Sequence, residues 1–282
     1  MKKIFFLIYF ILSLPTTALA DNVILMIGDG MGKNHIQCTN QKKNLFLSTL
    51  TPKGEIKTYS ANNAITDSAA SATAYACGIK TNNNYLAMNS NKESCETLAE
   101  MSAQRGYLTL IRTTDKVTGA TPSAFYAHTE SRYNTQKIEE YLKKALKKMD
   151  IQSVQYIDQE MRLVLNQLKN SDKPFFMMIE ESEIDKQSHH NNLEKMQEAL
   201  LRFDNAVQQA IEFSNEDKKT TVIILADHET GGLTDSCAYT KKNHSGANVF
   251  YFVEGQHASL FNEPILENKE IHHKIKHILF NQ

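Results

Sequence analysis

The sequence lacks tryptophan and is poor in glycine and proline, with 11 and 5 of these residues among 282. Repeat proteins and linker-rich chains use more glycine and proline, and no internal repeat is found, so neither class fits. An excess of charge is also lacking, because 31 basic and 32 acidic residues leave a formal net charge of −1. We therefore expect no nucleic-acid partner and no stable association with a membrane.

An apolar run long enough to span a bilayer is absent as well. The run at the N-terminus, residues 4–14, has only eleven residues and follows Lys2 and Lys3. After Pro15, the small residues of Ala18-Leu19-Ala20 form a typical cleavage site. We interpret residues 1–20 as a signal peptide and expect export to the periplasm or outside the cell. A retained anchor is the alternative.

Cysteine is scarce, and the spacings fit neither a zinc ribbon nor a CxxC pattern. The four cysteines are Cys38, Cys77, Cys95 and Cys237. Export permits one or two disulfides, but the pairing cannot be deduced from the sequence. Cys77 follows a run of small residues, where we expect a buried thiol.

The remaining residues, 21–282, suit a single catalytic domain of the α/β class, since no change in composition divides them. Apolar runs predict buried strands at 23–27, 107–111, 175–179, 221–226 and 249–253, with a weaker strand at 55–59. Helices are expected at 93–105, 135–149, 158–169, 192–214 and 269–279, and Thr121 is expected to cap another that begins at Pro122. The alternation predicts a mostly parallel central sheet flanked by helices on both faces.

Small residues follow Ser68 as far as Cys77 and predict a tightly packed helix that begins near this serine. The first turn of a helix has free N–H groups, and the helix dipole favours an anion there. A serine at this position can cap the helix, bind phosphate or attack it. Capping is the usual role of an isolated serine before a helix.

Three of the predicted strands end in an acidic residue: Asp29, Glu180 and Asp227. Ligands of open α/β sheets bind beyond the carboxyl ends of the strands, so these side chains are expected to gather at one edge. Each one alone would be interpreted as a helix cap. Three carboxylates together repel one another and need a cation.

Histidines accompany these acids. His228 follows Asp227 directly, Asp185 and His189 are four residues apart and share a face if helical, and His244 lies in a short polar loop. Ligand sets of aspartate and histidine favour zinc, whereas carboxylates with the hydroxyl of Thr121 favour magnesium. The planar guanidinium of Arg132 suits two oxygens of a phosphate.

Two local choices stay open. His190 adjoins His189 and could replace it as a ligand, although the four-residue spacing favours His189. Glu181 and Glu183 flank Glu180, whose position at the strand end favours it.

These residues lie in motifs that occur in the same order in alkaline phosphatases. The motifs are Gly28-Asp29-Gly30-Met31-Gly32, Thr66-Asp67-Ser68-Ala69, Ala120-Thr121-Pro122 with Ser131-Arg132, Glu180 with Ile184-Asp185-Lys186-Gln187-Ser188-His189, Ala226-Asp227-His228-Glu229-Thr230-Gly231-Gly232, and His244-Ser245-Gly246. The Asp-Ser-Ala, Ile-Asp-Lys-Gln and Ala-Asp-His-Glu-Thr-Gly-Gly matches are specific. The chain resembles this family from about Asn22 to the C-terminal helix, which implies its three-layer sandwich fold.

The resemblance implies a phosphate monoester hydrolase that acts through a phosphoserine at Ser68 and releases phosphate and an alcohol. It also implies two zinc ions and one magnesium ion. Asp185, His189 and His244 resemble ligands of the first zinc; Asp29, Asp227 and His228 those of the second; Asp29, Thr121 and Glu180 those of magnesium. Arg132 resembles the phosphate clamp, and Lys186 is similar to a lysine that reaches phosphate through water.

The chain departs from the family pattern in two respects. Some members have Asp or His two residues before the threonine, where this chain has Gly119, which bears on magnesium affinity and pH profile. The chain is also shorter than most members and lacks room for the insertions that commonly support dimers, so a homodimer stays open. A shorter chain predicts an open site and broad specificity for small phosphomonoesters.

Three alternatives compete with this interpretation. A sulfatase of the superfamily needs a C/S-x-P-x-R motif, whereas Ser68 is followed by Ala-Ala-Ser. A phosphodiesterase on this scaffold typically lacks the third metal site, whereas Thr121 and Glu180 are present. A non-catalytic phosphate- or metal-binding protein would be favoured by a lost nucleophile or ligand, and every expected position is filled.

Overall fold

The computed structural model describes residues 21–281, and the expected signal peptide lies outside these residues. Eight strands form one sheet in the order β10-β2-β9-β6-β1-β5-β3-β4. Their bounds are β1 Asn22–Gly28, β2 Gly54–Lys57, β3 Leu108–Thr113, β4 Asp150–Ser153, β5 Phe175–Glu181, β6 Thr220–Leu225, β9 Val249–Gly255 and β10 Ile265–Glu267. Two further strands, β7 Glu229–Thr230 and β8 His244–Ser245, pair separately beside the sheet.

The sheet is mostly parallel, as the alternation of strands and helices predicts. Strand β1 pairs in parallel with β5 and β6, and β3 pairs in parallel with β5 and β4. Only β9 runs the other way among these eight strands, since it is antiparallel to both β6 and β2. Every residue of β1, β5 and β6 is buried, which explains why these strands are continuous apolar runs.

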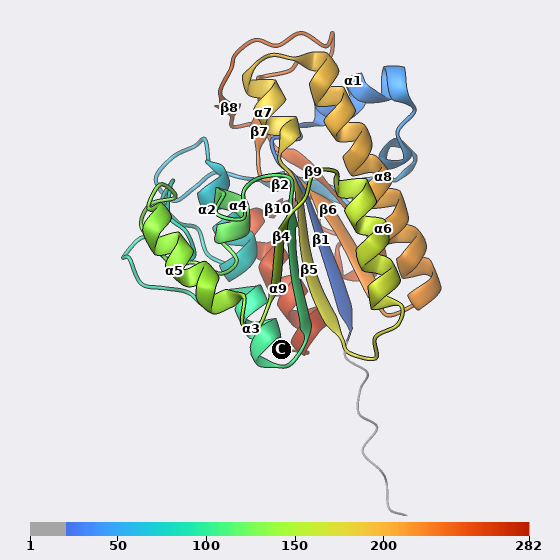
Figure 1. The fold of residues 1–282 in the computed structure, drawn as a ribbon. Helices are drawn as coiled ribbons and strands as arrows, with labels where there is room; N and C mark the ends of the chain where they lie inside the picture. Colours follow the sequence, from blue (N-terminus) through green and yellow to red (C-terminus); the bar gives the residue numbers. More distant parts are fainter. Residues whose placement is uncertain (1–20, 282) are drawn as a thin grey trace, which may run out of the picture.

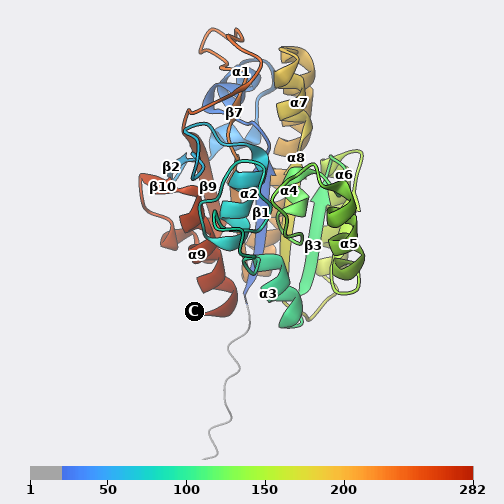
Figure 2. The ribbon, with the colours of Figure 1, turned by 90° about the vertical axis from the view of Figure 1, so that its left-hand side faces the viewer.

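Helices cover both faces of the sheet and make three layers (Figures 1 and 2). Their bounds are α1 Lys33–Lys43, α2 Ser68–Cys77, α3 Leu98–Gln104, α4 Ala120–Ser123, α5 Thr135–Ala145, α6 Ile157–Leu168, α7 Glu183–His189, α8 Leu193–Asp217 and α9 Asn268–Phe280. One face carries α2, α3 and α9, and the other carries α6 and α8. Among residues 21–281, no helix has the length and apolar character needed to cross a membrane.

Two helix starts differ from the sequence prediction. Thr121 is not a cap: Gly119 occupies the N-cap position of α4, which places Thr121 inside this short helix. Helix α3 begins at Leu98 rather than at residue 93, because Thr97 and Glu100 form a capping box. The short strands β4 and β10 were not predicted, since four and three residues give too little pattern.

The cysteines form two disulfides, Cys38–Cys237 and Cys77–Cys95. The expectation that Cys77 is a free buried thiol is therefore wrong. Cys77 is the last residue of α2, and the segment after this helix folds back so that Cys95 lies next to Cys77. The other bond ties α1 to the loop between β7 and β8.

The contact between α2 and α9 contains a buried histidine that makes stability depend on pH. Nδ1 of His272 lies 3.0 Å from the backbone oxygen of Ala76. Burial first, and then the charge of His273, lowers the pKa of His272 to about 4. Between pH 6.5 and 4 the unfolded chain binds a proton that the folded chain does not bind, so stability falls as the pH falls through this window. The loss attributable to His272 is about 3 kcal/mol.

We expect His272→Asn to remove only the part of the pH dependence that His272 contributes, because the asparagine amide still donates to Ala76 but does not titrate, whereas burial also lowers the pKa of His35 to about 4 and that of His228. The measurement is the free energy of urea unfolding of metal-free protein between pH 4 and 8. His277→Asn, on an exposed position of the same helix, is the control. A parallel pH dependence of wild type and His272→Asn would contradict the assignment.

Candidate active site

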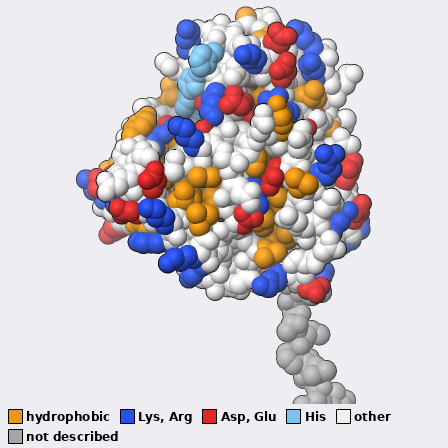
Figure 3. All heavy atoms as spheres, viewed as in Figure 1, with side chains coloured by type: hydrophobic (Ala, Val, Ile, Leu, Met, Phe, Trp, Pro, Cys, Tyr) orange, Lys and Arg blue, Asp and Glu red, His pale blue; other side chains and the backbone are white. Residues whose placement is uncertain are grey.

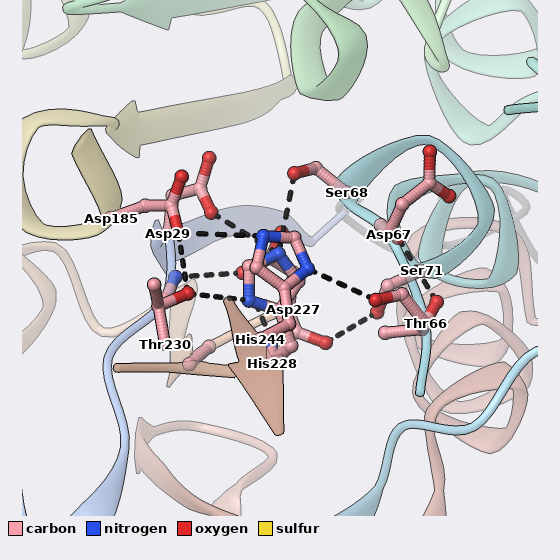
Figure 4. Close-up of polar contacts among 12 residues, drawn as sticks. Asp29, Thr66, Asp67, Ser68, Ser71, Asp185, Asp227, His228, Thr230 and His244 are labelled. Carbon is pink, nitrogen blue, oxygen red and sulfur yellow. Dashed lines mark hydrogen bonds and ion pairs between the residues drawn. The ribbon is translucent and has the colours of Figure 1, made fainter. Parts of the chain in front are cut away.

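Ser68 is the first residue of α2, at the carboxyl ends of the parallel strands (Figure 4). The helix cap is Asp67, whose side chain accepts a hydrogen bond from the Ala70 N–H, so Ser68 is not needed as a cap. Oγ of Ser68 lies 3.3 Å from Nε2 of His228. The serine is thus a buried hydroxyl at a helix N-terminus with its oxygen directed at an imidazole.

Small side chains let α2 approach the end of β6. All ten residues of α2 are buried. Oγ of Ser71 donates to the backbone oxygen of Asp227 at 2.7 Å, and the Tyr75 hydroxyl donates to that of Ala226 at 2.7 Å. These two bonds set the distance between Ser68 and the acidic strand ends.

Aspartate and histidine side chains converge beside Ser68 in two groups. Asp29, Asp227 and His228 form the first, and Asp185, His228 and His244 form the second; within each group the candidate ligand atoms lie within 4.8 Å of one another. The imidazoles of His228 and His244 stack with their centroids 3.6 Å apart. The structure therefore brings together five of the predicted metal ligands at one point of the sheet edge (Figure 4).

His189 lies beside the second group. Its Nε2 is 3.2 Å from Nε2 of His244 and 3.3 Å from Oδ2 of Asp185, while its Nδ1 is held by the backbone oxygen of Lys242. His190 turns away and contacts the backbone oxygen of Lys186 through Nδ1. Of the two adjacent histidines, His189 is therefore the one whose free nitrogen faces the site.

Thr230 joins the two groups and was not singled out in the sequence. Its hydroxyl donates to Oδ1 of Asp185 and lies 3.2 Å from Nδ1 of His228. Gly30 makes room for this contact, because a Cβ there would lie 2.8 Å from the Thr230 hydroxyl, and its φ is +72°. The threonine belongs to the Asp-His-Glu-Thr-Gly-Gly motif, which was the available signal.

The hydrogen bonds assign the tautomer of His228. Since the Thr230 hydroxyl donates to Asp185, its oxygen accepts the proton of Nδ1 of His228. Burial first, and then the charge of His244, lowers the pKa of His228 well below its usual value, so the ring is neutral. Nε2 then carries a lone pair, which faces Ser68 as well as Asp29 and Asp227 at 3.5 and 3.2 Å.

Two buried carboxyl groups of the site, those of Asp29 and Asp227, have raised pKa values. Burial, followed by the charges of Asp227 and Asp185, raises the pKa of Asp29 well above its usual value. Burial likewise raises the pKa of Asp227 to about 6. Oδ1 of Asp29 and Oδ2 of Asp227 are buried without a hydrogen-bond partner. Like charges with unpartnered oxygens, facing an imidazole lone pair, fit a bound cation.

Thr121 and Glu180 lie on neighbouring elements, since α4 packs against β5. The hydroxyl of Thr121 is buried and has no hydrogen-bond partner, and Oε2 of Glu180 accepts a bond from Thr113. Burial raises the pKa of Glu180 to about 7, although the nearby hydroxyls of Thr113 and Thr121 both act to lower it. Glu181 points to the other side of the strand and accepts from Thr114 at 2.8 Å, so Glu180 is the residue that faces Asp29.

Two basic side chains stand at the rim of the site. Nη1 of Arg132 donates to Oδ2 of Asp67 at 3.1 Å, and Nζ of Lys186 donates to Oδ1 of Asp115 at 2.9 Å. Asp67 and Asp115 were not predicted as parts of the site, because their role follows from contacts across the chain. On the surface, histidines gather near the place of α7 and β8, with acidic and basic side chains beside them (Figure 3).

Comparison with known proteins supports the geometry. The family model described as alkaline phosphatase matches residues 20–166 and 157–240. Alkaline phosphatase 4 of Bacillus subtilis is 30% identical over 297 residues, which cover 79% of this chain and 64% of that protein. Alkaline phosphatase 3 of the same organism is 28% identical over 76% of this chain and 62% of its own length. The chain thus spans a little under two thirds of the length of these curated relatives.

Solved structures agree with the sequence match. The alkaline phosphatase of the Antarctic bacterium TAB5 superposes with a TM-score of 0.85 at 26% identity, over 93% of this chain and 98% of that one. A variant of the TAB5 enzyme with bound magnesium superposes with a TM-score of 0.83 at 26% identity, over 93% and 99% of the two chains. Motif order, fold and the clustered Asp and His side chains agree with these matches, and the chain belongs to the alkaline phosphatase family.

Proposed function

We propose that this protein is a metal-dependent phosphomonoesterase that acts through a phosphoserine at Ser68. The observation that carries the proposal is the buried Ser68 hydroxyl at the N-terminus of α2, 3.3 Å from His228 and beside two convergent Asp/His groups. Family membership supports the same reaction class. Small phosphomonoesters are the proposed substrates.

The proposed cofactors are two zinc ions and one magnesium ion. Asp185, His189 and His244 would hold one zinc; Asp29, Asp227 and His228 the other; Asp29, Thr121 and Glu180 the magnesium. When bound, these ions lower the pKa of a coordinated hydroxyl or water and stabilise the charge on the leaving oxygen. The partnerless oxygens of Asp29, Asp227 and Thr121 support this set.

The side chains of the site suit two successive displacements. The Ser68 oxygen attacks phosphorus and the P–O bond to the alcohol breaks; water then attacks the phosphoserine, releases phosphate and returns the serine hydroxyl. The free N–H groups of α2 and the fork of Arg132 bind the equatorial oxygens, where the transition-state charge develops. Inversion at each step gives overall retention of configuration at phosphorus.

The test is hydrolysis of p-nitrophenyl phosphate by the purified protein after chelation and after return of zinc and magnesium. We expect turnover to disappear on chelation and to return with the metals. Bis(p-nitrophenyl) phosphate is the matched diester. Faster hydrolysis of the diester would favour the phosphodiesterase alternative, and binding without turnover of either ester would favour a non-catalytic protein.

We further propose that the protein acts in the periplasm or outside the cell. The signal peptide expected in residues 1–20 supports this location, and so do the two disulfides, which persist in oxidising compartments. Mass spectrometry of the extracytoplasmic fraction should find a chain that begins at Asp21. A cytoplasmic chain that retains residues 1–20 would contradict the proposal.

Asp67 is expected to orient the phosphate clamp. Its Oδ1 caps α2 through Ala70, and its Oδ2 accepts from Arg132. Oδ2 also accepts from the backbone N–H of Asn84 at 3.1 Å. Asp67→Asn keeps the capping oxygen but replaces this shared acceptor with an amide NH2, so we expect the inhibition constant of inorganic phosphate to rise about fivefold, with a smaller loss of stability than removal of the whole side chain causes. Asp67→Ala removes the cap as well, and should also lower the free energy of unfolding by about 1 kcal/mol.

Phosphate inhibition and urea unfolding of the two variants separate these roles. Equal stability of Asp67→Asn and Asp67→Ala would contradict the capping role. Unchanged phosphate inhibition in both variants would contradict the role in orienting Arg132.

A further inference from the structure

The side chain of Lys186 is held by three oxygens, of which two belong to the start of its own helix. Nζ lies 3.0 Å from Oγ of Ser182 and 3.3 Å from Oε1 of Glu183, both at the N-terminus of α7. The third oxygen, Oδ1 of Asp115 at 2.9 Å, comes from the loop after β3. Asp115 is therefore the one of these three partners that draws the lysine away from α7.

Asp115 occupies the volume that a side chain at position 119 would fill. Gly119 has a φ of −62°, which any residue adopts, so the backbone does not require glycine here. A Cβ at this position would lie 2.2 Å from Oδ2 of Asp115 and 2.9 Å from the backbone oxygen of Lys116. Space, rather than conformation, requires the glycine, and the Asp115 carboxylate takes that space.

The same loop is linked to Glu180 and to Thr121. The N–H of Asp115 donates to Oγ1 of Thr113 at 2.8 Å, and the Thr113 hydroxyl donates to Oε2 of Glu180. Gly119, next to the Asp115 carboxylate, is the N-cap of α4, which carries Thr121. Asp115 thus lies between Lys186 and the two residues proposed to bind magnesium.

We propose that Asp115 is a positioning residue, admitted by Gly119, that orients Lys186 toward phosphate and fixes the loop on which Glu180 and Thr121 depend. The inference rests on the proposed function, because it assigns Lys186 to bound phosphate. Asp115 lies outside the motifs that the chain shares with the family, so its carboxylate is an addition to the proposed site. It also predicts that Gly119 and Asp115 act as one unit.

The test compares four variants by two measurements: the inhibition constant of inorganic phosphate, and the rise in melting temperature of zinc-loaded protein on addition of magnesium. Asp115→Asn should weaken phosphate inhibition about fivefold. It should also lower the magnesium affinity at least about tenfold, because it keeps the backbone bond to Thr113 but removes the negative charge that acts on Glu180. Gly119→Ala should reproduce both effects, because its Cβ displaces the carboxylate. Lys186→Met should weaken phosphate inhibition alone, and adding Asp115→Asn to it should weaken inhibition no further.

Glu183→Gln is the matched control, because it removes a carboxylate from the same lysine without touching the space at Gly119. We expect less than a twofold change in either measurement. Effects of Glu183→Gln as large as those of Asp115→Asn would overturn the inference, since the loss of any negative charge beside Lys186 would then explain the changes in phosphate inhibition and magnesium affinity. A Gly119→Ala variant that behaves as wild type would overturn it as well.

The outcomes separate this inference from the proposed function. Hydrolysis by the wild type with no effect of Asp115→Asn overturns the inference alone. Phosphate binding followed by calorimetry, together with magnesium binding, in the absence of hydrolysis and with both still sensitive to Asp115→Asn, overturns the proposed function alone. A wild type that binds neither phosphate nor magnesium overturns both, because Asp115 would then have nothing to orient.

Discussion

The Ser68→Ala variant is expected to lose hydrolysis of p-nitrophenyl phosphate by a factor on the order of 10³ or more. The reason is that no neighbouring group replaces the attacking oxygen. Ser68 Oγ is the hydroxyl that faces Nε2 of His228, whereas Ser71 Oγ is committed to the backbone of Asp227. The measurement is kcat and KM with zinc and magnesium present.

A second readout distinguishes a lost nucleophile from a damaged site. Wild type incubated with inorganic phosphate and quenched in acid should carry a phosphate on the peptide that contains Ser68, as seen by mass spectrometry. Ser68→Ala should carry none, while its metal content is unchanged. Ser102→Ala, at a buried serine of α3 whose hydroxyl has no hydrogen-bond partner, is the matched control and should keep full activity. Substantial turnover by Ser68→Ala would rule out the phosphoserine route.

The Asp29→Asn variant is expected to be more stable than wild type without metal and less stable than wild type with zinc. In metal-free protein Asp29 is buried beside the like charges of Asp227, Asp185 and Glu180, which disfavours its ionised form. Folding of the metal-free chain therefore requires this carboxyl to take up a proton, and a neutral amide of the same shape avoids that cost. With zinc, the substitution removes a charged oxygen from the Asp29, Asp227 and His228 group.

We expect the melting temperature of metal-free protein to rise by about 2–4 °C, which corresponds to about 1 kcal/mol in a chain of this size. The zinc-induced rise in melting temperature should be largely lost, and hydrolysis should fall at least about 100-fold. Metal content after dialysis, measured by mass spectrometry, checks the loss of a ligand directly.

The control for Asp29→Asn is the same change at Asp204. This aspartate is mostly buried but accepts from the N–H groups of Phe46 and Leu47 rather than facing other acids. Asp204→Asn should therefore leave the zinc response unchanged. A normal zinc response in Asp29→Asn would remove Asp29 from the proposed ligand sets.

Much of the fold was predictable because its central strands are buried on both faces. Such strands must be continuous apolar runs, and β1, β5 and β6 are visible in the sequence for this reason. The direction of β9 was not visible, since an antiparallel strand in a covered sheet carries the same apolar pattern. The pairing of Cys77 with Cys95 was not visible either, because it depends on how the segment after α2 folds back against the end of that helix.

The sequence by itself determined which side chains are present at the site: acidic residues at strand ends, histidines beside them, and Ser68 before a run of small residues. These signals are local, because each depends on a neighbour in the chain. What only the tertiary structure decided is which groups share a contact. Thr230 joins His228, which is two residues away in the sequence, to Asp185, which is 45 residues away. Asp115 contacts Lys186, which is 71 residues away. Such pairs leave no periodic pattern, since they are set by the packing of separate elements at the sheet edge.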